Sequence, residues 1–241
     1  MNPASLDEAK KIIRKTRACA TGLEHTDVVA CLPFVYISAV ISKKDSDNLK
    51  LGAQSVSVEE GGPHTGEVSA SMLNNLGVKY VIAGHSEERV RGDSDEIVSR
   101  RVKAIVEAGM NAVLCVGEKV RDEGGAYLEA LKEQIEMSLS AVPAHRAKNI
   151  VIAYEPIWAI GVQEAMKPEQ VHEMSLFVRK VFSDIFTQDQ AMKVPVLYGG
   201  SVNARNAAEI ISRGQVDGLL VGRESINPVG FVELLKAVDA M

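Results

Sequence analysis

The sequence has 241 residues, of which 46% are hydrophobic and 24% are charged, and its formal net charge is -5 at pH 7. This length and composition predict one globular domain, residues 1–241, with a substantial core and a size typical of a single α/β barrel. The mild negative charge argues against general nucleic-acid binding and against a basic membrane-surface protein.

The cysteines and the apolar runs exclude further classes. The three cysteines form no CxxC pair and have no ligand spacing with the five histidines, which argues against a disulfide framework or a zinc site. The first residues lack the apolar stretch of a secretory signal, and no apolar run approaches the roughly 18 to 20 residues of a membrane span. We therefore expect a cytoplasmic protein.

Short apolar segments alternate with longer amphipathic ones along the whole chain. Most of the short segments are almost continuously apolar, which is typical of parallel strands covered on both faces. They predict seven strands, at residues 28–33, 49–53, 80–83, 112–116, 150–154, 194–198 and 218–221.

The longer segments predict about eight helices, and the chain begins with one of them. Ser5 with Glu8 has the spacing of a capping box, and Asp93 with Glu96 has the same spacing before a second apolar stripe. Two later helices are expected to begin near Pro168 and near Pro228.

The repeated strand–helix units predict parallel strands with right-handed crossovers, either in a barrel or in an open doubly wound sheet. The sequence contains no G-x-G-x-x-G after a first strand and no G-x-x-x-x-G-K-[ST], so the usual marks of nucleotide-binding versions are missing.

Polar and glycine residues follow the predicted strands. His85 and Glu87 come just after strand 80–83, and Glu155 comes just after strand 150–154. Glycine-rich turns at 198–202 and 218–225 match the phosphate site that barrels build after their last two strands. Each signal is weak alone, because such residues are often helix caps or turns. Together they predict acid/base chemistry on a small phosphorylated substrate.

Four segments are similar to motifs of the triosephosphate isomerase family, in the family's order. They are Gly-Glu-Val-Ser-Ala-Ser-Met-Leu at 66–73, Gly-His-Ser-Glu at 84–87, Tyr-Glu-Pro-Ile-Trp-Ala-Ile-Gly at 154–161 and Tyr-Gly-Gly-Ser-Val at 198–202. The resemblance implies a (β/α)8 TIM barrel and an isomerase of glycolysis and gluconeogenesis. Its reaction would interconvert dihydroxyacetone phosphate and glyceraldehyde 3-phosphate through an enediolate.

The resemblance also implies the residue roles. Glu155 would be the base, His85 a neutral imidazole that polarises the carbonyl oxygen, and Glu87 a further catalytic residue. The phosphate would be bound by Gly161, Ser201, Gly222 and Arg223, and the lid would contain Pro156, Ile157, Trp158, Ala159 and Ile160. No metal or cofactor is implied. Family members are usually homodimers in which a loop like the one around Thr65 lies beside the partner's active site.

The sequence departs from the family at its beginning. The family opens with a strand ending Asn-Trp-Lys-Met-Asn, and only the Met-Asn at positions 1 and 2 matches it. We therefore expect a barrel without its first strand and without the catalytic Lys, with open edges at strands 28–33 and 218–221 that invite pairing. A separate peptide carrying that strand would restore activity, and a truncated chain or a misplaced start is the other explanation.

Two further functions stay open at this stage. A catalytically inactive barrel that serves as a binding or assembly subunit is favoured by the missing Lys and opposed by the intact Glu155 and His85. An aldolase would need a Schiff-base Lys at a strand end, and no predicted strand ends in one.

Overall fold

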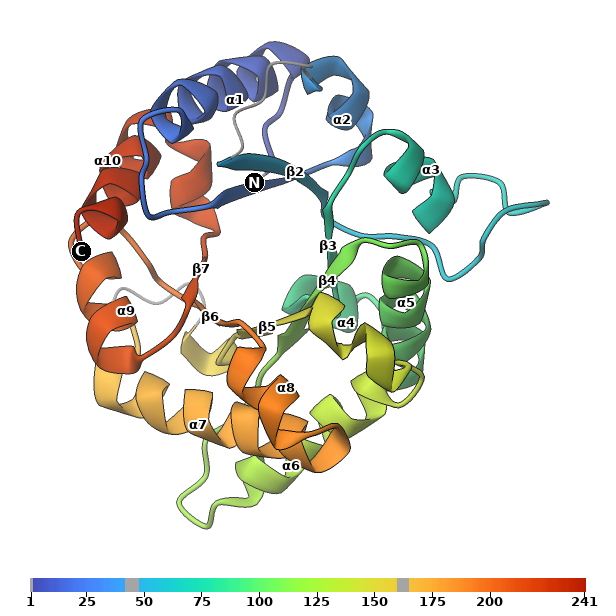
Figure 1. Ribbon diagram of the computed structural model, residues 1–241, viewed down its shortest axis with the longest axis vertical. Coiled ribbons are helices and arrows are strands. Elements are labelled where there is room, and N and C mark those ends of the chain that lie inside the picture. The colour runs from blue at the N-terminus through green and yellow to red at the C-terminus, as the bar shows by residue number, and fades with distance from the viewer. Residues whose placement is uncertain (1, 42–47, 160–164) are drawn as a thin grey trace.

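The fold is described from a computed structural model, which covers residues 2–41, 48–159 and 165–241. Seven strands form one parallel sheet in the order of the chain, and the sheet curls into a partial barrel with the helices outside it (Figure 1). The strands are β1 (Val28–Leu32), β2 (Leu49–Ala53), β3 (Tyr80–Ala83), β4 (Asn111–Val116), β5 (Ile150–Tyr154), β6 (Val196–Gly199) and β7 (Gly218–Leu220).

The prediction of seven parallel strands is confirmed, and two of the strand boundaries that differ from the prediction lie beside prolines. Strand β1 ends before Pro33, and β6 begins after Pro195 rather than at residue 194. Proline has no N–H to donate to a sheet ladder, so regular pairing stops or starts next to it.

The described residues form ten α-helices, more than the eight or so predicted. Three of them are short helices capped by a side chain just before their first residue: Ser69 caps α3, His85 caps α4 and Thr187 caps α8. The ten are α1 (Leu6–Ala20), α2 (Phe34–Val40), α3 (Ala70–Asn75), α4 (Ser86–Val90), α5 (Asp95–Glu107), α6 (Ala126–Leu139), α7 (Pro168–Ile185), α8 (Gln188–Lys193), α9 (Ala207–Gly214) and α10 (Pro228–Asp239). Three 3-10 turns add η1 (Ala144–Asn149), η2 (Ile157–Ala159) and η3 (Arg223–Ile226).

Local signals at Ser5, Pro168 and Pro228 predicted the starts of α1, α7 and α10. The Ser5 hydroxyl accepts from the Glu8 N–H at 3.2 Å, as its capping-box spacing predicts. The prediction for α5 was wrong by one residue, because Ser94 and not Asp93 caps it, with the Ser94 hydroxyl accepting from the Ile97 N–H. The Asp93 carboxylate instead pairs with Arg101 at 2.9 Å, a contact between side chains that capping rules do not consider.

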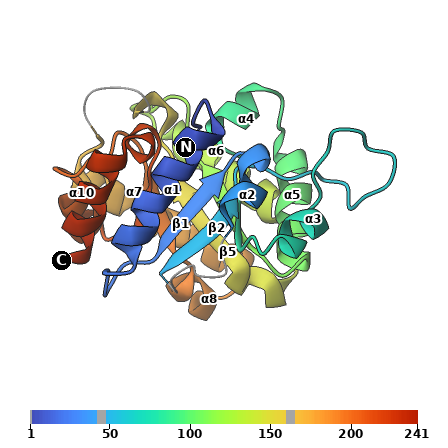
Figure 2. The same cartoon turned by 90° about the horizontal axis from the view of Figure 1, so that it is seen from above.

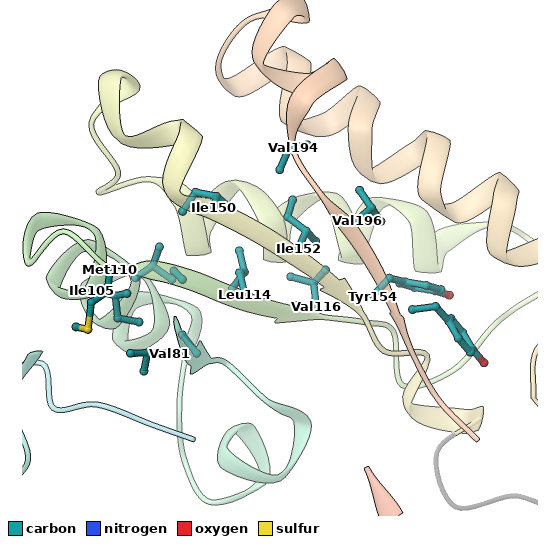
Figure 3. Close-up of a cluster of buried hydrophobic side chains, with 14 of the residues drawn as sticks. Val81, Ile105, Met110, Leu114, Val116, Ile150, Ile152, Tyr154, Val194 and Val196 are labelled. Atoms are coloured by element: carbon teal, nitrogen blue, oxygen red, sulfur yellow. The ribbon is translucent and has the colours of Figure 1, made fainter. Parts of the chain in front are cut away.

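The larger apolar core lies between the strands and the surrounding helices. Leu114, Ile152 and Val196 come from three neighbouring strands and are fully buried in it (Figure 3). The inner face of the sheet carries a smaller cluster, in which Val113, Cys115 and Ala153 are buried. Other apolar side chains on this inner face are only partly buried: Tyr80, Ile82, Val151, Leu197 and Leu220.

The ring of helices closes, whereas the ring of strands does not. Helix α1 packs against α10, and the Asp239 carboxylate at the end of α10 accepts from the Glu24 and His25 N–H groups at 2.8 to 3.1 Å. In the described sheet, β1 pairs only with β2 and β7 pairs only with β6. A cavity of about 860 Å³ lies inside, lined by residues from both of these edge strands. Figure 2, turned by 90° from Figure 1, shows α1, β1 and β2.

None of the helices in the described part of the chain is long and apolar enough to cross a bilayer. The segment 57–69, between β2 and α3, extends away from the rest of the molecule (Figures 1 and 2).

The contact of Asp239 with the turn before β1 gives a prediction about pH. The His25 N–H holds the pKa of the Asp239 carboxyl below its usual range, so the ionised form stabilises the folded state. This contribution is present above the unfolded-state pKa and is lost as the pH falls through the lowered folded-state pKa. We expect Asp239→Ala to lower the melting temperature by a few degrees at pH 7, and the difference to vanish in strong acid.

The matched control is Glu24→Ala, which leaves the Glu24 N–H in place and should melt like the parent at both pH values. A destabilisation by Asp239→Ala that is equally large in strong acid would contradict the electrostatic account.

Candidate active site at the carboxyl ends of the strands

A histidine and a carboxylate that are 70 positions apart in sequence meet at one end of the sheet. His85 follows β3 and Glu155 follows β5, and the His85 Nε2 lies 3.3 Å from the Glu155 Oε1. Because all seven strands are parallel, their carboxyl ends gather at one edge of the sheet. The topology therefore brings together two groups that can exchange protons with a substrate.

The position of His85 at the start of α4 determines which of its two ring nitrogens carries the proton when the imidazole is neutral. The His85 Nδ1 accepts from the Glu87 N–H at 3.3 Å, which is a helix N-cap made by an imidazole. An accepting Nδ1 carries no proton, so the neutral ring carries its proton on Nε2, and this N–H faces Glu155. The preceding Gly84 has φ +72°, and a Cβ there would lie 2.9 Å from Val98. Glycine thus permits the turn that presents the imidazole.

Glu155 is 6% exposed, and two glycines make room for it. A Cβ at Gly199 would lie 2.7 Å from the Glu155 Cγ, and one at Gly117 would lie 1.8 Å from the Glu155 carbonyl oxygen. Both distances are shorter than the van der Waals contact distance of a carbon atom with another carbon or with an oxygen. Small residues at the ends of β4 and β6 are therefore required for a carboxylate to enter this position.

Burial raises the pKa of the Glu155 carboxyl. His85, the Cys115 thiol and the Ser86 N–H oppose that rise, and the negative charge of Glu87 adds to it. Burial also raises the pKa of the Cys115 thiol, so the thiol stays protonated and donates to the carboxylate. The Glu155 Oε2 is buried and has no hydrogen-bond partner among the described residues. One oxygen of the carboxylate thus faces His85, and the other is an unused acceptor.

The predicted lid begins directly after Glu155. Pro156, Ile157, Trp158 and Ala159 lie in the described part, where the Ile157 N–H donates to the Glu118 carbonyl at 3.0 Å. Ile160 and Gly161, which the sequence also assigned to the lid and to the phosphate site, lie outside the described residues. Further along the chain, where the description resumes at residue 165, the Met166 N–H donates to the Tyr198 hydroxyl at 3.1 Å.

The remaining predicted phosphate residues follow the last two strands. Ser201 lies two residues after β6, and the Asn206 side-chain amide donates to its carbonyl at 3.0 Å. Gly222 lies two residues after β7, and Arg223 begins the short turn η3 with its side chain exposed. Both turns thus stand at the same edge of the sheet as Glu155. Thr65 is exposed on the extended segment 57–69.

Sequence reasoning missed two residues next to Glu155. Cys115 is an inner-face residue of β4, and the alternation of strand side chains would have placed it there. Glu118 is 5% exposed and follows β4 just as Glu155 follows β5, so its position after a strand was the available signal. Within the described residues, no group of three or more His, Cys, Asp or Glu side chains could hold a metal ion.

The parallel sheet, the outer helices and the histidine–carboxylate pair at the carboxyl ends of the strands define a protein of the α/β-barrel class. Comparison with known proteins makes this specific, because the family model described as triosephosphate isomerase matches residues 1–238. The chain belongs to the triosephosphate isomerase family, which confirms the resemblance drawn from its motifs.

Individual relatives agree with the family model. A triosephosphate isomerase of Fusobacterium nucleatum is 38% identical over 232 residues, which cover 95% of this chain and 92% of the relative. One of Carboxydothermus hydrogenoformans is 37% identical over 95% of this chain and 92% of the relative. One of Acetivibrio thermocellus is 41% identical over 88% of this chain and 85% of the relative.

The room made by Gly199 gives a prediction about the site. We expect Gly199→Ala to push the Glu155 side chain out of place, and a misplacement of about 1 Å can cost on the order of 100-fold in rate. The measurement is kcat for triose phosphate isomerisation, with a peptide of the family's first strand added to the parent and to each variant. The matched control is Gly22→Ala, whose new Cβ would lie 3.7 Å from the nearest atom, an ordinary contact, and which should leave kcat unchanged. Full activity in Gly199→Ala would mean that Glu155 does not need this position.

Proposed function

We propose that this chain interconverts dihydroxyacetone phosphate and glyceraldehyde 3-phosphate by proton transfer through an enediolate. The observation that carries the proposal is the facing pair at the strand ends, with the His85 Nε2 at 3.3 Å from the Glu155 Oε1 and the Glu155 Oε2 buried and unpartnered. A buried acceptor whose pKa is raised by burial suits the removal of a proton from a carbon beside a carbonyl.

In this proposal Glu155 and His85 have different catalytic roles. Glu155 takes the proton from one carbon of the substrate and returns it to the neighbouring carbon. His85, neutral and protonated on Nε2, donates toward the oxygen that becomes negative in the enediolate. Glu87 is the third catalytic residue, because its N–H fixes the imidazole and its charge helps to keep Glu155 basic.

The phosphate and the lid complete the proposed site. Backbone N–H groups at Ser201, Gly222 and Arg223, with Gly161 beyond the described residues, would bind the phosphate. The segment 156–160 would close over the substrate and exclude water, which protects the enediolate. The reaction needs no metal or organic cofactor. It would serve glycolysis and gluconeogenesis in the cytoplasm, with homodimers formed through the segment around Thr65.

We also propose that activity requires an eighth strand between β1 and β7, carried by a separate peptide. The open cavity of about 860 Å³ and the partly exposed apolar inner face support this, since both would be covered by one more parallel strand. The family's first strand carries a Lys just before its final Met-Asn, and this Lys would be a preorganised cation beside the developing oxyanion. The loss of one such donor costs on the order of 100- to 1000-fold in rate.

The base assignment predicts opposite effects on activity and on stability. With a peptide of the family's first strand present, Glu155→Gln should lower kcat by about 100- to 10,000-fold, the usual contribution of a general base. Because burial raises the folded-state pKa of Glu155, its ionisation destabilises the fold as the pH rises through that pKa. The Gln variant should therefore melt at or above the parent's temperature at pH 7. A variant with the parent's kcat would end the assignment of the base.

The strand proposal predicts a response to an added peptide. A synthetic peptide of the family's first strand, ending in Asn-Trp-Lys, should raise both the melting temperature and the isomerase rate of this chain. The same peptide with Lys replaced by Met should still raise the melting temperature but leave the rate about 100- to 1000-fold lower.

A scrambled peptide of equal composition is the control for nonspecific binding. The absence of any change in stability or rate with the Lys peptide would contradict the proposed strand. A rise in stability without any isomerase activity would instead favour the alternative function, an inactive barrel that acts as a binding or assembly subunit.

A further inference from the structure

The guanidinium of Arg89 lies against the turn that carries His85. Arg89 belongs to α4, and its side chain is 12% exposed. Its Nε donates to the Gly84 carbonyl at 2.7 Å, and its Nη2 donates to the Cys115 carbonyl at 3.3 Å. A Cβ at Gly84 would lie 2.8 Å from the same Nη2. Arg89 is therefore packed directly against the backbone that leads to the imidazole.

The two carbonyls lie where the pairing of β3 with β4 ends. The last pair of residues in that register is Ala83 with Leu114, and Gly84 and Cys115 are the next residues of the two chain segments. The chain turns away from the sheet after β3, because Gly84 has φ +72°. A buried carbonyl that loses its ladder partner is costly unless another donor replaces it. Arg89 supplies a donor to each carbonyl and so joins the two diverging strand ends.

The guanidinium is held from its other side by two helices. Its Nη1 lies 2.5 Å from the Asp95 carboxylate in the first turn of α5, and its Nη2 also donates to the Ser138 hydroxyl of α6 at 3.4 Å. Each of the three guanidinium nitrogens thus has an acceptor. Because the guanidinium is planar and presents its donors in a fixed fork, these acceptors together determine its position and its orientation.

The carbonyls that Arg89 binds belong to residues beside the reactive groups. Gly84 directly precedes His85, and the Cys115 thiol donates to the Glu155 carboxylate. Arg89 and Glu155 also line the same small cavity. A displacement of the Gly84 carbonyl would move the imidazole, so the 3.3 Å separation between His85 and Glu155 depends on the contact that Arg89 makes.

We propose that Arg89 is a positioning residue, which sets the distance between His85 and Glu155 by holding together the ends of β3 and β4. It acts through the Gly84 and Cys115 carbonyls and does not itself touch the substrate. Its effect on kcat rests on the proposed isomerase function, whereas its effect on the backbone belongs to the folded chain and can be measured without activity.

The contact with Gly84 can be tested in the unaltered chain by nitrogen-15 NMR. We expect the Arg89 Nε–H to exchange with water at least about tenfold more slowly than that of Arg91, whose side chain is 70% exposed. It should also show a scalar coupling to the Gly84 carbonyl carbon across the hydrogen bond. An Arg89 Nε–H that exchanges as fast as that of Arg91 in the folded chain would overturn the proposal.

Arg89→Lys tests the fork itself, because an ammonium group keeps the charge but lacks the planar arrangement of donors. With a peptide of the family's first strand present, we expect kcat to fall by about 100-fold, the effect of a misplacement of about 1 Å. We expect KM to change by less than about threefold. Arg91→Met removes an exposed arginine next to the same helix and is the matched control, with the parent's kcat. A parental kcat in Arg89→Lys would overturn the proposal.

Asp95→Asn separates the carbonyl contacts from the ion pair. It keeps an oxygen acceptor for the Arg89 Nη1 and leaves the contacts with Gly84 and Cys115 in place. We expect a lower melting temperature, because a partly buried cation loses its counter-charge, but a kcat within about threefold of the parent's. A loss of kcat as large as that in Arg89→Lys would show that the ion pair is responsible, and would overturn the proposal.

The Glu87 amide gives a measurement that is independent of activity. Its N–H donates to the His85 Nδ1, so it reports the seat of the imidazole. We expect its exchange with water to be about tenfold faster in Arg89→Lys and unchanged in Arg91→Met. Exchange at the parent's rate in Arg89→Lys would overturn the proposal, even if the complemented chain proved inactive and the proposed isomerase function failed. Circular dichroism establishes that each variant is folded, and if Arg89→Lys is not, the exchange of the Arg89 Nε–H in the parent decides.

Discussion

The burial of one carboxylate constrains most of the structure at the carboxyl ends of the strands. Glu155 can enter its position only because Gly117 and Gly199 have no side chains, and a protonated Cys115 thiol points at it from the inner face of β4. The imidazole opposite is fixed by a helix N–H that its other nitrogen accepts. The exclusion of water thus raises the pKa of the Glu155 carboxyl, while His85, the Cys115 thiol and the Ser86 N–H partly oppose that rise.

The partial barrel has an outer ring of helices and an inner ring of strands, and in the described residues only the outer ring is closed. The helices close around the sheet, since α1 and α10 pack together and Asp239 ties their ends. The strands leave an opening, and the inner apolar face is wetter than the outer one as a result. The packing of α1 against α10 holds the segments that carry β1 and β7 near each other, although these two strands do not pair in the described sheet.

A second buried carboxylate holds the residues on either side of Glu155. The Glu118 Oε1 accepts from the Trp158 Nε1 at 2.8 Å and from the Tyr154 hydroxyl at 2.9 Å. The Glu118 carbonyl also accepts from the Ile157 N–H. The turn after Glu155 is therefore fixed by a residue that follows β4, while His85, which follows β3, faces the Glu155 carboxylate itself.

The order of strands and helices could be read from the sequence because it rests on local rules. Apolar runs, the Ser5 cap and the prolines at 168 and 228 act over a few residues, so no knowledge of distant neighbours was needed. Family motifs supplied Glu155 and His85. Where a side chain had competing partners, local reasoning failed, as when Asp93 pairs with Arg101 and leaves the cap of α5 to Ser94.

Only the tertiary structure decided the rest. The separation of 3.3 Å between His85 and Glu155, the burial of Glu118 and the seat of Arg121 over Tyr127 all depend on chain segments that meet after folding. The sequence by itself determined that parallel strands would carry an acid/base pair at their ends. Which charges end up buried, and what compensates them, was set by packing, because desolvation depends on the atoms that surround a group and not on its neighbours in sequence.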